Sequence, residues 1–139
     1  MKKIFLCLIV VLSLMLASCF GERSRSPANN PVSTSEAITQ GETVFALWEP
    51  DGYYYPGVVA AIIERQARIS FLDGDEDLVP VEHIINLDTA LNTLALEGNW
   101  EFLGLFYTGN LSSREPMIML YDDGDVEQVQ LVQLRGARR

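Results

Sequence analysis

A ten-residue stretch of this chain occurs twice. Residues 48–57 read WEPDGYYYPG and residues 100–109 read WEFLGLFYTG, so Trp, Glu, Gly, Tyr and Gly recur at a spacing of 52. A second match, FLDGD at 71–75 and YDDGD at 121–125, follows at a spacing of 50. The second copy therefore needs only a two-residue deletion between the matching segments. Two matches in register indicate a duplicated structural unit and predict two similar small folds in one chain.

The first nineteen residues predict export. Lys2 and Lys3 supply a positive start, residues 4–16 are almost wholly apolar, and the sequence LASC follows directly at 16–19. This order is typical of a secretory signal peptide, which we place at residues 1–18. The apolar run of about 13 residues is shorter than the roughly 20 that a membrane-spanning helix needs. An ordinary signal peptide or a short uncleaved anchor is the alternative to the lipid attachment considered next.

The end of this segment resembles the lipobox of bacterial lipoproteins, in which small residues precede a cysteine that is lipidated and becomes the mature N-terminus. The resemblance implies that Cys19 carries lipid such as palmitate and attaches the exported chain to a membrane. In that family an aspartate after the cysteine favours the inner membrane. Phe20 stands there and implies the outer membrane or its periplasmic side. Ser, Pro, Asn and Arg dominate the following residues, so we expect a flexible tether over 19–40.

Cysteine content and charge exclude several classes of function. Cys7 would leave with the signal peptide and Cys19 would carry lipid, which leaves no thiol for a disulfide, a metal site or a nucleophile. Without Lys2 and Lys3 the net charge changes from −9 to 8 − 19 = −11. From residue 41 onward there are six Arg against seventeen acids, whereas a nucleic-acid partner requires a basic face. We therefore expect no nucleic-acid partner, and a basic or cationic partner suits the acidity better.

Both copies carry the signals of short strands and turns. The strands expected in the first copy are 44–48, 58–63, 67–71 and 78–81, with a short fifth element at 82–85; those expected in the second are 94–100, 105–111, 117–121 and 126–131, with a fifth at 132–134. Asp73-Gly74 and Asp123-Gly124 predict two-residue hairpin turns with positive φ at both positions. Alternation places Tyr54 on the opposite strand face from Tyr53 and Tyr55. Residues 86–93 predict one helical turn capped by Asp88, and Arg138-Arg139 a frayed tail.

A unit of this size buries little apolar surface, so closure into a small barrel is the favoured fold. We predict an all-β protein with barrels at 41–87 and 94–135. The residues ALWEPDGYYYPGVV at 46–59, with ISFLDGD at 69–75, resemble a Tudor domain, and the second copy resembles a more diverged one. The resemblance implies bent five-stranded SH3-like barrels. In the methyl-reading members of the family, aromatic walls form a cage for methylated lysine or arginine.

Carried over by position, the resemblance implies one aromatic cage in each copy. The predicted walls are Trp48, Tyr55 and Phe71, with Tyr53 as a further candidate, and Trp100, Tyr107 and Tyr121. The fourth aromatic of some family cages falls on Gly74 and Gly124, so these cages would have three sides. Asp75, Glu76 and Asp125 would supply negative charge to a bound cation. The alternative is that the same aromatic side chains only fill the barrel interiors.

The remaining motifs point away from catalysis. Asp73, Asp75 and Asp77 form a D-x-D-x-D run, but Ile84 occupies the position where a calcium loop requires a bidentate Glu. We expect no metal or other cofactor. The sequence has one histidine, His83, and no nucleophile motif, so we expect no enzyme. We favour a lipid-anchored binding module for a protein or small cationic ligand in the envelope. The alternatives are a structural or assembly lipoprotein without a ligand pocket and a carboxylate-dependent hydrolase of cell-wall material.

Overall fold

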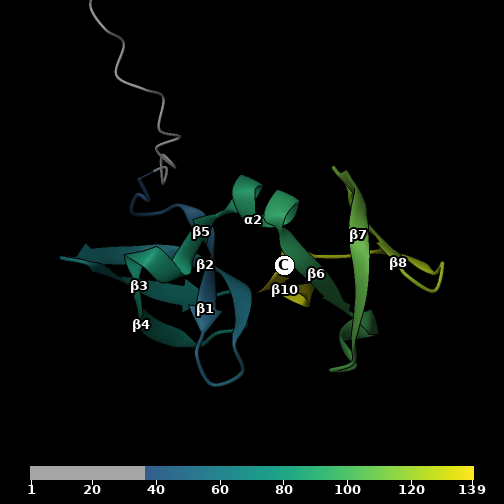
Figure 1. The fold of residues 1–139 in the computed structure, drawn as a ribbon, viewed down its shortest axis with the longest axis horizontal. Coiled ribbons are helices and arrows are strands. Elements are labelled where there is room, and N and C mark those ends of the chain that lie inside the picture. The colour runs from purple at the N-terminus through teal and green to yellow at the C-terminus, as the bar shows by residue number, and fades with distance from the viewer. Residues whose placement is uncertain (1–36) are drawn as a thin grey trace, which may run out of the picture. The chain divides into compact units, whose positions relative to one another are not determined.

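The computed structural model describes residues 37–139, so the predicted signal peptide and Cys19 lie outside the described part. Apart from one short helix and three 3-10 turns, the described chain is all-β, as predicted (Figure 1). The first copy contains β1 (Thr43–Trp48), β2 (Tyr53–Ile63), β3 (Gln66–Phe71), β4 (Glu76–Pro80), η1 (Val81–His83) and β5 (Ile84–Asn86). The second contains β6 (Leu94–Asn99), η2 (Trp100–Phe102), β7 (Phe106–Arg114), β8 (Met117–Tyr121), β9 (Val126–Gln128), η3 (Leu131–Gln133) and β10 (Leu134–Arg138). Helix α2 (Leu87–Thr93) connects the copies.

The duplicated sequence produces duplicated topology. In each copy the first four strands form an antiparallel meander, and the fifth strand pairs back with the first: β5 with β1, and β10 with β6. A register shift interrupts the ladder between Val59 and Ala61 in one copy and between Leu111 and Ser113 in the other. These positions are 52 residues apart, so the irregularity itself is duplicated.

The copies are joined into one antiparallel sheet. Strand β10 pairs with β6 along its length and with β2 where Gly136 faces Tyr54, and the two copies lie within one compact unit. Tyr54 is buried and packs in a cluster with Leu94, Leu96 and Leu134 of the second copy. The predicted alternation at Tyr54 is therefore confirmed, and its side chain contributes to the core of the other copy. A second cluster, which includes Val44, Ile69 and Val79, belongs to the first copy alone.

The predictions for the C-terminal end of the second copy and for the helix cap require correction. Arg138 is not part of a frayed tail, because β10 continues to this residue. The fifth strand of the second copy begins at Leu134 instead of Val132. The second copy therefore extends past the predicted boundary at residue 135. The helix between the copies is capped by Asn86, whose Oδ1 accepts a hydrogen bond from the backbone N–H of Thr89 at 2.9 Å. Asp88 lies in the first turn and pairs with Arg114.

The hairpin turns have three residues instead of two. Within these two turns, only Gly74 and Gly124 have positive φ, at +106° and +98°. Asp73 and Asp123 do not. Gly74 N–H donates to the Phe71 carbonyl at 3.1 Å, and Phe71 N–H donates to the Asp75 carbonyl at 2.8 Å. The same bonds recur around Gly124. This is a turn followed by a glycine bulge, which requires positive φ at one position only.

We expect Gly74→Val to lower the free energy of unfolding by about 2 kcal/mol, because a β-branched residue is strained at this φ. A Cβ at this position meets no atom within 4 Å, so the loss would come from the backbone and not from a clash. Thermal and urea unfolding of residues 37–139 would measure it. Leu72→Val, in the same turn at ordinary φ, is the matched control. An unchanged unfolding midpoint for Gly74→Val would show that the turn is placed wrongly.

Among residues 37–139, no helix has the length and apolar composition needed to cross a membrane.

Candidate functional site

The three aromatic residues predicted as walls in the first copy line one pocket. Trp48 ends β1, Tyr55 lies in β2 and Phe71 ends β3, so the sheet pairing brings their side chains to one end of the copy. The pocket has a volume of about 140 Å³. The rings of Trp48 and Phe71 meet edge to face, with centroids 5.5 Å apart and an interplanar angle of 88°. Phe71 is only 5% exposed, so it forms the pocket floor.

The second copy builds a matching pocket of about 220 Å³ from Trp100, Tyr107 and Tyr121. Tyr121 lies edge-on to both partners, with ring centroids 5.3 Å from Trp100 and 6.4 Å from Tyr107. Like Phe71 it is nearly buried, at 3% exposure. All six wall residues carried over from the Tudor resemblance therefore line two pockets at equivalent places.

Carboxylates line both pockets, although they are not quite the predicted set. Asp73 and Asp75 line the first pocket, and Asp123 and Asp125 line the second. In each turn the first aspartate accepts a hydrogen bond from the backbone N–H of the second, at 3.2 and 3.1 Å. Glu76, predicted as a pocket acid, instead accepts from the Ser70 hydroxyl at 2.9 Å.

Asp51 is a pocket acid that the sequence analysis did not identify. Its Oδ1 accepts from the backbone N–H of Tyr53 at 2.9 Å, and its Oδ2 accepts from the Tyr55 hydroxyl at 2.6 Å. Burial, and then the hydrogen bond to Asp51, raise the pKa of Tyr55, so its hydroxyl remains a donor at neutral pH. Leu103 occupies the equivalent position in the second copy, so this acid is present in the first pocket alone.

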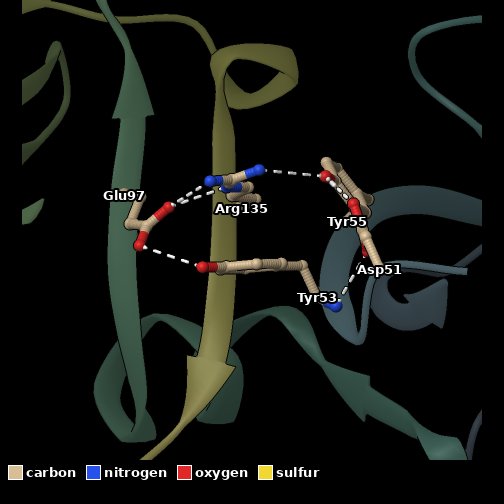
Figure 2. A network of polar contacts seen from close by, with 5 residues as sticks. All are labelled: Asp51, Tyr53, Tyr55, Glu97 and Arg135. Atoms are coloured by element: carbon tan, nitrogen blue, oxygen red, sulfur yellow. Dashed lines mark hydrogen bonds and ion pairs between the residues drawn. The ribbon is translucent and has the colours of Figure 1, made fainter. Parts of the chain in front are cut away.

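Tyr53, predicted as a further wall, contributes to a joint between the copies (Figure 2). The Arg135 guanidinium lies 3.9 Å from the centroid of the Tyr53 ring and 3.8 Å from that of Phe106. Its Nε and Nη2 each lie 2.7 Å from Glu97 Oε2. Its Nη1 donates to the Tyr55 hydroxyl oxygen at 3.5 Å, and the Tyr53 hydroxyl donates to Glu97 Oε1 at 3.4 Å. A cation of the chain itself is thus held by aromatic faces and a carboxylate.

The sequences of the two copies differ at the pair of residues that forms this joint. Glu97 and Arg135 face each other across β6 and β10, and the equivalent pair across β1 and β5 is Phe45 and Ile85. An apolar pair in one copy is therefore replaced by an ion pair in the other. The side chains of Arg135 and Glu97 are 20% and 16% exposed, so the charges are largely withdrawn from water.

Beneath the second pocket, Tyr121 anchors a polar network. Its hydroxyl donates to Glu127 Oε2 at 2.7 Å, and burial, then this carboxylate, raise the pKa of Tyr121. Glu127 Oε1 accepts from the backbone N–H of Glu101 at 3.1 Å and from Gln133 Nε2 at 3.3 Å. Phe71 has no hydroxyl, so the first pocket lacks the corresponding contact.

The D-x-D-x-D run does not act as one unit. Asp73 and Asp75 line the first pocket, whereas Asp77 lines a separate cavity of about 260 Å³ with Glu49 and His83. His83 Nδ1 lies 3.9 Å from Glu49 Oε1. Among residues 37–139, no three His, Cys, Asp or Glu side chains are grouped to hold a metal ion.

A scan against protein-family models gives no match to this chain, and a comparison with curated proteins gives none either.

Proposed function

We propose that this chain is a lipid-anchored, non-catalytic envelope protein whose two copies are Tudor-like, SH3-like barrels that bind cationic groups of a protein or small ligand. One observation carries the proposal. The same aromatic triad and the same pair of turn aspartates meet around a pocket in both copies. The duplicated meander, with its fifth strand paired back to the first, supports the assignment to SH3-like folds.

The composition of the pockets favours an organic cation. An aromatic face attracts such a cation by about 0.5–2 kcal/mol per contact, and carboxylates at the rim add Coulombic attraction. Both pockets are smaller than the roughly 300–1,000 Å³ of sites for whole drug-sized molecules. A single side-chain tip or a small ammonium group fits this scale. The joint between the copies already holds the Arg135 guanidinium by the same chemistry.

The chain offers a separate fluorescent reporter for each pocket. It has two tryptophans, Trp48 and Trp100, and each lines one pocket. Trp100→Phe leaves the first pocket as the source of tryptophan emission, and Trp48→Phe leaves the second. We expect trimethyllysine or choline at millimolar concentration to change the emission of at least one variant, because a bound cation would contact the indole face.

Tyr55→Ala, on the Trp100→Phe background, should remove most of the response of the first pocket, since one wall is lost. Tyr55→Phe is the matched control, because it keeps the ring and loses only the hydrogen bonds to Asp51 and Arg135. Sodium chloride at equal ionic strength corrects for general salt effects. No response from either pocket to either cation would refute the proposed function.

One observation favours the alternative, an assembly role without a ligand. Phe71 and Tyr121 are nearly buried and pack in the apolar clusters, so part of each triad stabilises the fold whether or not a ligand binds. Two results together would favour this role. Tyr55→Ala would lower the free energy of unfolding by about 3–5 kcal/mol, and neither trimethyllysine nor choline would change the tryptophan emission.

The lipid anchor has its own test. We expect Cys19→Ser to abolish labelling by a palmitate analogue and to leave the precursor uncleaved before that residue, because serine offers no thiol for the lipid. Metabolic labelling and the electrophoretic mobility of the precursor would measure both effects. Cys7→Ser is the matched control and should be labelled normally. Normal labelling of Cys19→Ser would contradict the lipoprotein assignment.

A further inference from the structure

The loop after Trp100 exposes an apolar surface beside the second pocket. Phe102, Leu103 and Leu105, here called the apolar loop, are 54%, 63% and 53% exposed. The loop starts at one pocket wall, Trp100, and leads into β7, which carries another wall, Tyr107. Its base is closed by hydrogen bonds from Trp100 N–H to the Leu105 carbonyl and from Leu103 N–H to the Trp100 carbonyl, each at 2.9 Å.

The fold does not require these apolar residues. Pro50, Asp51 and Tyr53 occupy the equivalent positions of the first copy, where the chain makes the same connection. There, Gly52 is the one residue of the loop with positive φ. The second copy therefore has large apolar side chains that face water where the first copy has a shorter turn with Pro50 and Asp51.

The second copy also holds this loop in a strained backbone conformation. Glu101 and Phe102 have φ of +45° and +57°, a region that costs a residue other than glycine free energy. Glu101 N–H is held by Glu127 Oε1 at 3.1 Å, and Gly104 N–H by Asn99 Oδ1 at 2.7 Å. These two hydrogen bonds hold the loop backbone against that cost, so less free energy is needed to order the loop when a partner binds.

We propose that the apolar loop and the second pocket form one docking surface for a peptide segment in which a cationic residue is flanked by large apolar residues. The cation enters among Trp100, Tyr107 and Tyr121, where Asp123 and Asp125 complement its charge, and an apolar neighbour covers Leu103 and Leu105. The inference rests on the proposed cation pocket and names the partner of that pocket. The first copy, with Asp51 at the position of Leu103, recognises the cation without this apolar preference.

The test uses Trp48→Phe, in which Trp100 reports on the second pocket. The probes are trimethyllysine amide and two tripeptides, acetyl-Leu-trimethyllysine-Leu-amide and acetyl-Ser-trimethyllysine-Ser-amide. We expect the leucine peptide to bind about tenfold more tightly than the serine peptide, because partial burial of a leucine side chain supplies this difference. Leu103→Ser with Leu105→Ser should remove the preference and leave the affinity for trimethyllysine amide unchanged. Ile63→Ser, at a comparably exposed residue in β2, is the matched control and should keep the preference.

The outcomes separate this inference from the proposed function. If trimethyllysine amide binds and the two peptides bind equally, the inference fails and the proposed cation pocket stands. If no probe changes the Trp100 emission, both fail for this copy. If the loop variant changes only the sedimentation behaviour of the protein or its binding to neutral phosphatidylcholine vesicles, the surface serves self-association or lipid contact, and the peptide inference is overturned.

Discussion

Arg135→Ile is expected to lower the free energy of unfolding by about 3 kcal/mol, because it leaves the carboxylate of Glu97 largely buried without its partner. It also removes the cation that lies between Tyr53 and Phe106, which connects the two copies. Urea unfolding of residues 37–139, followed by circular dichroism, would measure the loss. Arg114→Ala is the matched control. Its ion pair with Asp88 is mostly exposed, and we expect a loss of less than about 1 kcal/mol.

The first copy suggests how to restore this stability. Phe45 and Ile85 occupy the positions equivalent to Glu97 and Arg135, so Glu97→Phe with Arg135→Ile reproduces an apolar pair that the duplicated unit already accommodates. We expect the double variant to recover most of the loss, since replacement of a buried ion pair by packed apolar residues is often neutral or stabilising. If the double variant is no more stable than Arg135→Ile alone, the ion pair is not exchangeable with its apolar equivalent, and our account of the joint is wrong.

Gly98→Ala is expected to lower the free energy of unfolding by about 3 kcal/mol through overpacking. A Cβ at residue 98 would lie 2.5 Å from the Tyr121 hydroxyl oxygen and 3.0 Å from a carbon of its ring. Tyr121 cannot easily move, because it is buried and its hydroxyl is bonded to Glu127. Thermal and urea unfolding would measure the effect.

Tyr121→Phe should rescue this variant. The first copy has Ala46 and Phe71 at these positions, so the alanine is accommodated where the ring carries no hydroxyl. Alone, Tyr121→Phe should cost about 1.5 kcal/mol for the lost hydrogen bond to a charged acceptor. In the double variant Gly98→Ala with Tyr121→Phe, the loss in free energy of unfolding should stay near the loss for Tyr121→Phe alone. It should not reach the sum of the two single losses. Additive losses in the double-mutant cycle would show that residue 98 and Tyr121 do not interact as described.

The repeats made the strands and the pockets accessible to prediction. Turn glycines and alternating apolar residues are local signals, and they predicted most strands of both copies. The wall residues followed from the Tudor resemblance because side chains at the ends of neighbouring strands converge once the pairing is known. Tyr54 was assigned correctly to a strand face by alternation alone. The sequence did not reveal that this face packs against the other copy.

The features that the sequence predicts wrongly depend on contacts between residues that lie far apart in the chain. The sequence predicts an end of the second copy at residue 135 and a frayed tail at Arg138-Arg139, because the last residues of a domain are usually poorly ordered unless another element holds them. Pairing with β6 overrides that local preference. Alternation does not separate Tyr53 from Tyr55, since both lie on one strand face. In the structure the Arg135 guanidinium lies over the Tyr53 ring, whereas Tyr55 lines the first pocket. Asp51 was missed because its role depends on the orientation of the Tyr55 hydroxyl.

Strand β10 also affects the order in which the fold can be completed. Residues 134–138 pair with β6 and, at Gly136, with β2, so a late segment of the chain contacts strands from both copies. While the chain emerges from residue 1 onward, β6 lacks this neighbour, and Tyr54 lacks the contact with Leu134 in its cluster. The first copy cannot finish folding before the second has begun. The last contacts of both copies therefore depend on one segment, residues 134–138.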